Sequence, residues 1–519
     1  MSISPKSRIS RRTFLKGVMG GAVAVGLAPG LIAFGQPRLR AGFIYLTSPG
    51  DAGWTFRHEQ GRRFAEQQFA ASELGQEFRL ETVATENVSD PDAERVARGF
   101  AAQRFDVVFA TSFGFMDGTL AAAFDFPNVH FEHCSGFKVG ANMGNYFGRM
   151  YQARYLSGLV AGAMTQRNVL GYVAAIPIPE VIRILNAFYL GAKTVNPEVT
   201  MRVVGLGTFF DPPKARESAF ALIEAGADVV TMHEDTPAVP QAAEERGVFS
   251  VSYQSDMSKF ALNSHLTGVF WNWGPYYLQT LETLAQAKLS GARYPIRTVW
   301  SGFENKEGFV EPMVGISNEV GGGSSGLINE LLIRRLAGAS KVREILNLVE
   351  KKQKELLNDP FLGNGVIFQG PIRDDQTGEV TIPDGIVPSD LHLLSMDYPV
   401  EGVSGPGFFP DRSSALPAFE GIRNTDQVVI TFNGRASGIG FLNLTITTVD
   451  GSKGFSSGPR GFPPGTPAMD VATAFRQAFT ADGTFEVGGE TRVITISAME
   501  PLNVSAQSGD GGIRIEVFR

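Results

Sequence analysis

Polar and aromatic side chains gather where the predicted strands of this chain end. The turn after the apolar run 42–46 carries Asp51 and Trp54. The other residues at or just after a predicted strand end are Phe113, Glu132, Glu180, His233, Asp235, Gln254, Asp256, Trp271 and Trp273. Flat rings beside carboxylates and amides suit a planar, largely apolar ligand with a few polar edges.

Alternating strands and helices space these residues between positions 38 and 300. Short β-branched or aromatic runs predict strands at 42–46, 78–84, 106–110, 128–131, 169–174, 201–205, 228–232, 249–253 and 266–271. Helices are predicted at 54–69, 90–104, 148–166, 181–195, 212–226 and 238–247. This α/β rhythm is typical of parallel sheets with helices on both faces. Two such sheets facing each other would line one cleft with their strand ends.

Composition narrows the possible functions of the 519-residue chain. The length predicts two to four domains, and a net charge of −7 does not favour nucleic acid as a partner. A single cysteine, Cys134, excludes an intramolecular disulfide. None of the six histidines are paired at i, i+4, so we expect no metal and no cofactor. We expect Cys134 to be a buried thiol and not a catalytic partner of His133, because neighbours in a strand alternate sides.

Residues 1–36 have the pattern of an export signal. Two adjacent arginines, Arg11 and Arg12, precede Thr-Phe-Leu-Lys and an apolar Gly/Ala-rich run at 17–34. This matches a twin-arginine signal and predicts a protein that works in the periplasm or on the extracytoplasmic face. The alternative is a signal that is kept as a single membrane anchor.

The C-terminal region differs from the rest of the chain. Residues 404–425 are rich in Gly, Pro and Ser and read as a linker. Alternating patterns then predict strands at 428–433, 442–449, 484–487, 492–498 and 512–518, with one helix at 468–478. Residues 426–519 resemble the small β-rich modules of phage-tail-like and surface proteins. Surface attachment, self-association and no separate activity all stay open for this accessory domain.

Six motifs resemble the BMP-type (basic membrane protein, PnrA-like) substrate-binding proteins of ABC importers. They are GFIYLTSPGDAGWTFRHEQGRR, FEHCSG, NYFGRMYQARYLSGLVAG, GYVAAIPIPEVIRILNAFYLGAKTVNP, YQSDMS and WNWGPYY, in the order of that family. The later segments GPI, at 370–372, and LLSMDYPVEGV, at 393–403, also resemble that family. The resemblance spans residues 38–403 and implies a type I periplasmic-binding-protein fold, with two doubly wound lobes joined by a three-segment hinge. We expect lobe 1 at 37–146 and 257–300, and lobe 2 at 147–256 and 301–370.

The resemblance also implies a purine-type ligand, either a nucleoside or a related molecule. Trp54 falls where an aromatic residue stacks on the base. In the loop that holds ribose, Gln254 replaces the first acid while Asp256 is retained, and Trp271 replaces a sugar-binding lysine. Losing two charged groups removes strong hydrogen bonds to hydroxyls, whereas added rings favour stacking. A free base such as adenine is therefore expected in preference to a nucleoside.

The candidate ligand-binding residues are Asp51, Trp54, Phe113, Glu132, Asn186, His233, Asp235, Gln254, Asp256, Trp271 and Trp273. Two indole rings are expected to hold the ligand between them, while Glu132 and Asn186 read its polar edge. Structural alternatives remain for several of these residues: a helix cap for Asp51, core packing for Phe113, a helix-surface amide for Asn186, and hinge packing for one of the two later tryptophans.

We therefore expect a solute-binding protein that delivers its ligand to an ABC permease without altering it. One alternative is a sensor or surface protein that is attached through residues 426–519. Another is an extracytoplasmic nucleoside hydrolase or deaminase with Glu132 as its base. No nucleophile or metal cluster in the sequence supports this enzyme.

Overall fold

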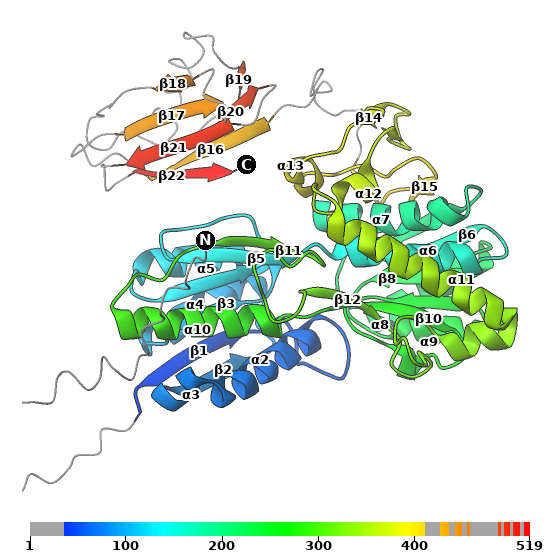
Figure 1. The fold of residues 1–519 in the computed structure, drawn as a ribbon, viewed down its shortest axis with the longest axis horizontal. Helices are drawn as coiled ribbons and strands as arrows, with labels where there is room; N and C mark the ends of the chain where they lie inside the picture. The colour runs from blue at the N-terminus through cyan, green and yellow to red at the C-terminus, as the bar shows by residue number, and fades with distance from the viewer. Residues whose placement is uncertain are drawn as a thin grey trace, which may run out of the picture. The chain divides into compact units, whose positions relative to one another are not determined.

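The computed structural model describes residues 36–410 and the strands within residues 426–518. The expected export signal, linker residues 411–425 and the expected helix at 468–478 lie outside the described residues. Residues 38–404 form two α/β lobes, each built on its own sheet (Figure 1). This confirms the expected fold class.

The first lobe is built on a six-stranded sheet in the order β11-β5-β4-β3-β1-β2, with every neighbouring pair parallel. Its strands are β1 (Arg38–Ile44), β2 (Arg79–Thr85), β3 (Val107–Ala110), β4 (His130–Cys134), β5 (Met143–Gly148) and β11 (Thr298–Ser301). Its helices are α2 (Trp54–Ala71), α3 (Glu73–Glu77), α4 (Ala93–Ala102), α5 (Met116–Asp125) and α10 (Gly274–Ser290).

Alternation along the strands of this lobe buries both faces of the sheet. Phe43 and Phe109 join the core that includes Phe69 of α2, whereas Ile44 joins the core beneath α4 and α5. Helices α2 and α10 therefore cover one face, and α4 and α5 cover the other.

The second lobe is built on a seven-stranded sheet in the order β12-β10-β9-β8-β6-β7-β15. Its strands are β6 (Val169–Ala174), β7 (Thr200–Gly205), β8 (Val229–His233), β9 (Phe249–Ser252), β10 (His265–Trp271), β12 (Val314–Ser317) and β15 (Val403–Ser404). All its pairs are parallel except that of β12 with β10. Its main helices are α6 (Met150–Met164), α7 (Pro179–Val195), α8 (Pro212–Glu224), α9 (Ala238–Arg246) and α11 (Glu330–Asn358).

The chain crosses between the lobes three times, after β5, after β10 and after β11. One expected boundary is wrong, because residues 257–271 were assigned to the first lobe. Strand β10 instead pairs with β9 in the second sheet, and the chain returns only at Gly274, where α10 begins. A buried apolar strand carries no signal in its own sequence for which of two sheets it joins.

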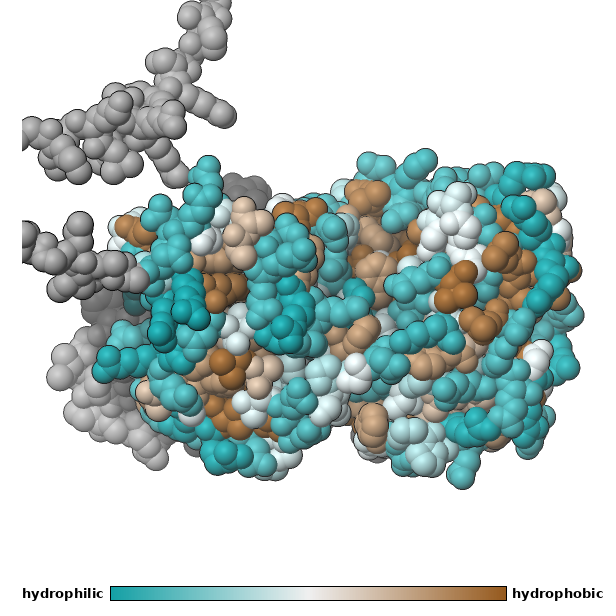
Figure 2. All heavy atoms as spheres, turned by 90° about the horizontal axis from the view of Figure 1, so that it is seen from below, coloured by the Kyte–Doolittle hydropathy of each residue, from teal (hydrophilic) through white to brown (hydrophobic). Residues whose placement is uncertain are grey.

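The segment after α11 packs back onto the second lobe. It contains α12 (Asn364–Phe368), the hairpin β13 (Ile372–Arg373) and β14 (Val380–Ile382), and α13 (Asp390–Leu394), before it ends in β15. Among the described residues, no helix has the length and apolar character needed to cross a membrane. On the face drawn in Figure 2, hydrophobic residues form separate patches among hydrophilic ones.

The C-terminal region contains two antiparallel sheets, in the orders β19-β20-β16-β22 and β18-β17-β21. Strands β16 (Asp426–Gly434), β17 (Leu442–Thr448), β19 (Glu486–Gly488), β20 (Val493–Ala498) and β22 (Ile513–Phe518) match the expected ones. Strands β18 (Gly454–Ser456) and β21 (Leu502–Ser508) were not expected. The first is very short, and the second is rich in Ser, Asn and Gln, which have little strand propensity.

Candidate ligand-binding site

The two lobes meet where the β1–α2 turn of the first lobe touches the strand ends of the second. The Gly53 amide donates to Ser255 Oγ at 3.1 Å, and Arg57 Nε donates to the Trp271 carbonyl at 2.5 Å. Gly53 has φ 94°, and a side chain there would run into the Asp235 carbonyl. We call this contact zone the interlobe seam.

An aromatic cluster lies at the seam, made of Trp54, His58, Phe147, Trp271 and Trp273. The Trp271 and Trp273 rings stack with centroids 4.7 Å apart, and the His58 ring covers Trp273 from 4.9 Å at an angle of 3°. Trp54 stands edge-on to Trp271, with centroids 5.7 Å apart. Five residues from both lobes thus form one packed group.

This packing contradicts the expected pair of indole rings on either side of a ligand. A flat ligand needs parallel rings about 7 Å apart, twice an ordinary carbon–carbon contact. Trp273 offers no such face, because His58 and Trp271 cover it on both sides and it is fully buried. Trp273 is therefore a structural residue. Trp54, which keeps 8% of its surface exposed, and Phe147, at 7%, remain the available rings.

Hydrogen bonds connect the indoles to the polar side of the seam. Trp54 Nε1 donates to the Thr111 carbonyl at 2.6 Å. Trp271 Nε1 donates to Gln254 Oε1 at 2.6 Å, and Gln254 Nε2 donates to Asp235 Oδ1 at 2.7 Å. Gln254 has φ 72°, a left-handed conformation that is uncommon outside glycine and aims its amide between the two partners.

Two titratable groups of the second lobe lie beside this chain of bonds. Asp235 is half-buried as a residue while its carboxyl group is enclosed, and this burial raises the pKa of Asp235 to about 7 against the opposing Gln254 hydrogen bond. His233 is fully buried, and burial lowers its pKa although Glu180 Oε1 lies 3.6 Å from its Nε2. His233 therefore favours its neutral form at neutral pH, whereas Asp235 gains or loses its proton in this pH range.

The structure gives three expected ligand contacts other roles. Glu132 lies inside β4 and not after it, and its carboxylate accepts from Tyr276 at 2.7 Å and Tyr294 at 2.8 Å. Asn186 uses its amide to hold the backbone of Tyr398 and Val400. We remove both from the candidate site because their hydrogen-bonding atoms are already engaged inside their own lobes.

Asp256 is the third expected ligand contact that has another role. Its carboxylate accepts from Ser258 and from the Glu319 amide within the second lobe. Asp51 is exposed and pairs with Lys259 at 3.4 Å across the seam, while Gly53 occupies the cap position of α2. Phe113 is half-buried at the start of a short 3-10 turn that follows β3.

Two charged residues near the start of α7, Glu180 and Arg183, also lie at the seam. The sequence pattern at predicted strand ends points to Glu180 but not to Arg183. Glu180 keeps 12% of its side chain exposed. Arg183 is only 4% exposed, yet its guanidinium makes no hydrogen bond within the described part of the chain. Its Cζ lies 5.9 Å from the centroid of the Phe147 ring and 5.3 Å from the centroid of the Trp300 ring, both of the first lobe. The signal that was overlooked is an arginine within the apolar run VIRILNAF.

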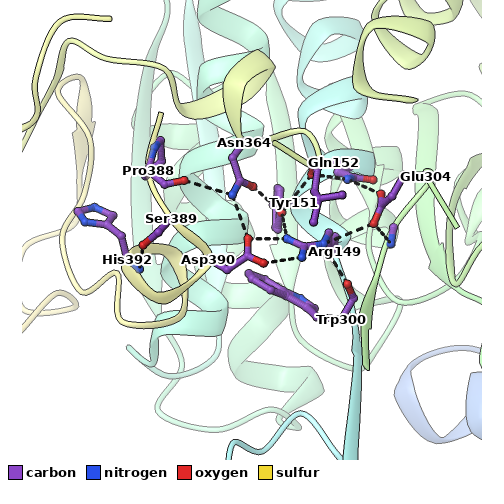
Figure 3. Close-up of polar contacts among 12 residues, drawn as sticks. Arg149, Tyr151, Gln152, Trp300, Glu304, Asn364, Pro388, Ser389, Asp390 and His392 are labelled. Carbon is purple, nitrogen blue, oxygen red and sulfur yellow. Dashed lines mark hydrogen bonds and ion pairs between the residues drawn. The ribbon is translucent and has the colours of Figure 1, made fainter. Parts of the chain in front are cut away.

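Another arginine, Arg149, connects segments that cross between the lobes (Figure 3). It lies on the first crossing and donates two bonds to Asp390, at 2.8 and 2.6 Å. Its Nε donates to the Trp300 carbonyl at 3.0 Å, on the strand that leads into the third crossing. Burial alone would raise the pKa of Asp390, but the Arg149 guanidinium beside it holds that pKa below its usual value. Arg149 therefore ties two crossings to α13.

Cys134 and His133 do not form the pair that nucleophilic catalysis would need. Cys134 is buried, and burial raises the pKa of its thiol well above the usual value. His133 bonds to the Ser112 carbonyl at 2.9 Å, so it does not form a pair with Cys134. No group of three His, Cys, Asp or Glu residues in the described ranges could hold a metal ion.

Comparison with known proteins agrees with this class of site. A crystal structure of an ABC transporter solute-binding protein from Aeropyrum pernix K1 covers 70% of this chain and all of its own, with a TM-score of 0.50 and 16% identity. This likeness supports the fold. Residues 39–302 match the model of the Bmp family, which is described as "ABC transporter substrate-binding protein PnrA-like".

Two relatives extend the similarity. The "Purine-binding protein BAB2_0673" of Brucella abortus is 36% identical over 74% of this chain and 97% of its own length. The "Putative ABC transporter glucose-binding protein TsgA13" of Haloferax volcanii is 40% identical over 51% of this chain and 65% of its own. The two lobes and the seam define a substrate-binding component of an ABC transporter. The chain belongs to the BMP, PnrA-like family of these proteins.

Proposed function

We propose that the protein binds a free purine base between its lobes, adenine in preference to a nucleoside, and delivers it unaltered to an ABC permease. The observation that carries this proposal is the composition of the seam. The rings of Trp54 and Phe147 from the first lobe lie at the seam, where Arg183 of the second lobe stands 5.9 Å from Phe147 and has a buried nitrogen without a hydrogen-bond partner among the described residues. Stacking surface with a few hydrogen-bonding groups is what a purine base requires.

The contact between Trp271 and Gln254 supports a base over a nucleoside. These are the positions at which the family resemblance implies sugar-binding groups. Here the indole N–H and the amide oxygen satisfy each other at 2.6 Å, so neither has that hydrogen bond left for a hydroxyl. The indole also fills space, because Trp271 is fully buried.

Ligand exchange requires the lobes to separate. Trp271 is fully buried and Trp54 is 8% exposed, which leaves the rings no path for a ligand while the seam is formed. Rotation about the three crossings would open the seam, and a bound purine would favour its closure. The closed form would then present both lobes to the permease.

Calorimetry of the full chain tests the proposal against adenine, hypoxanthine, adenosine, inosine and glucose. Glucose is included because the Haloferax relative carries that name. We expect adenine to bind most tightly and to be recovered unchanged by mass spectrometry. Tighter binding of adenosine would overturn the preference for a base, while glucose binding without purine binding would overturn the ligand class. Recovery of a reaction product would overturn the transport role.

We further propose that the protein works outside the cytoplasm after twin-arginine export, and that residues 426–519 serve a role apart from ligand binding, such as surface attachment. Fractionation of cells that express the chain with Arg11 and Arg12 both changed to Lys tests the export route. We expect this variant to stay in the cytoplasm. Normal export would contradict twin-arginine targeting.

A further inference from the structure

Glu180 and Arg183 stand one helical turn apart near the start of α7, and both have hydrogen-bonding capacity to spare. Among the described residues, Arg183 Nε is buried without a hydrogen-bond partner, and Glu180 Oε1 lies 3.6 Å from His233 Nε2, beyond hydrogen-bond distance. Burial lowers the pKa of the Arg183 guanidinium, although the Glu180 charge opposes the shift. A ligand that supplies a hydrogen-bond partner would offset the cost of this burial.

The surroundings place both groups at the seam. Arg183 lies against Phe147 and Trp300 of the first lobe. Burial raises the pKa of Cys134 in the first lobe and of Tyr253 in the second. The next largest cause, which also raises both pKa values, is the negative charge of Glu180. The Glu180 carboxylate is therefore within electrostatic reach of strand ends from both lobes.

Resting on the proposed function, we infer that Glu180 and Arg183 read one edge of the purine. The Glu180 carboxylate accepts a hydrogen bond from an exocyclic amine, and the Arg183 guanidinium donates to the ring nitrogen beside it. Adenine presents this sequence of donor and acceptor along one edge. The pair replaces Glu132 and Asn186, whose hydrogen-bonding atoms are used inside their own lobes.

The experiment compares adenine with unsubstituted purine, which keeps the ring nitrogens but lacks the amine. Binding to the full-length wild type, Glu180→Gln and Arg183→Met is measured by calorimetry. Glu180→Gln should weaken adenine about 10- to 100-fold and leave purine nearly unchanged, because only adenine has the amine. Arg183→Met should weaken both ligands by a similar factor, because both have the ring nitrogen.

Matched controls on exposed positions of the same lobe are Glu198→Gln and Arg167→Met, which should bind both ligands like the wild type. Arg183→Lys is a second variant in case methionine disturbs the seam. It keeps the charge but lacks the planar group, so it should recover part of the affinity. Thermal melts of the ligand-free variants should show that Arg183→Met is at least as stable as the wild type.

The outcomes separate the two proposals. If the wild type binds neither adenine nor purine, the proposed function fails. If it binds adenine while Glu180→Gln and Arg183→Met match their controls, the proposed function stands and this inference is overturned. If Glu180→Gln weakens the binding of adenine and of purine equally, Glu180 does not recognise the exocyclic amine, and this inference is overturned.

Discussion

The contact between Gly53 and Asp235 offers the sharpest test of the seam. Gly53 has φ 94° and ψ −166°, a region that is almost confined to glycine. A Cβ at this position would collide with the Asp235 carbonyl of the other lobe. Gly53→Ala should therefore disfavour the closed arrangement and leave each lobe intact.

The size of the effect follows from the backbone. Holding a residue with a side chain in this region costs about 1–3 kcal/mol. When the lobes separate, the turn can relax, because the Gly53 amide loses its bond to Ser255. The cost then falls on closure and lowers ligand affinity about 5- to 150-fold. The collision with Asp235 adds to this value.

Gly50→Ala is the matched control in the same turn. Gly50 also has positive φ, at 58°, but the nearest atom to an added Cβ is the Ala52 carbonyl at 4.0 Å. Its strain is equal in open and closed forms, so affinity should stay at the wild-type value. Calorimetry with adenine gives the affinity, and small-angle scattering with and without adenine reports closure. Equal affinities for the two variants would refute the proposed contact on closure.

Three further results are expected. Trp54→Ala should weaken adenine binding about 5- to 150-fold through the loss of about 1–3 kcal/mol of stacking, measured by calorimetry well below the lowered melting temperature; wild-type affinity would contradict the stacking role. Because burial raises the pKa of Asp235 to about 7, its ionisation opposes closure: affinity should be highest at and below about pH 4, fall as the pH rises from there to about 7, and then level off. Asp235→Asn should flatten this profile. Glu132→Gln is the control: burial also raises the pKa of Glu132 to about 7, but this residue lies inside the first lobe away from the seam, so its loss should leave the profile unchanged. A profile that Asp235→Asn does not change would refute the assignment to Asp235. Truncation after residue 410, which keeps β15 in its sheet, should leave adenine affinity unchanged, and a loss would show that the C-terminal region takes part in binding.

Periodicity predicted most of the two lobes because buried parallel strands and amphipathic helices have distinct patterns. Side-chain direction was harder to predict. The strand around Glu132 was expected to end at residue 131 but runs to Cys134, which turns Glu132 from a terminal position into a core one. In a strand, a shift of one residue exchanges the two faces. Local pattern does not fix the last residue of a strand to that precision.

Long-range partners were beyond the reach of the sequence. Asn186 lies midway along α7, and its amide is taken by a segment more than 200 positions further on. The stacking of His58 on Trp273 likewise joins residues that are far apart in the chain. Trp54 was predictable as a ring at the start of α2, but its edge-on contact with Trp271 depends on how β10 and α10 connect the lobes.

Two arginines flank the Trp300 ring, and the difference between them assigns their roles. Arg149 lies 4.2 Å from the ring and donates to Asp390, Tyr151 and the Trp300 carbonyl, so its charge is balanced within the fold. Arg183 lies 5.3 Å from the same ring and donates no hydrogen bond among the described residues. The donors of Arg149 thus have structural partners, whereas the buried Nε of Arg183 has none among the described residues, which leaves it available to an acceptor from outside the fold. Arg149 therefore ties together the crossings between the lobes, and under the inference proposed above Arg183 would make closure of the lobes depend on the ligand.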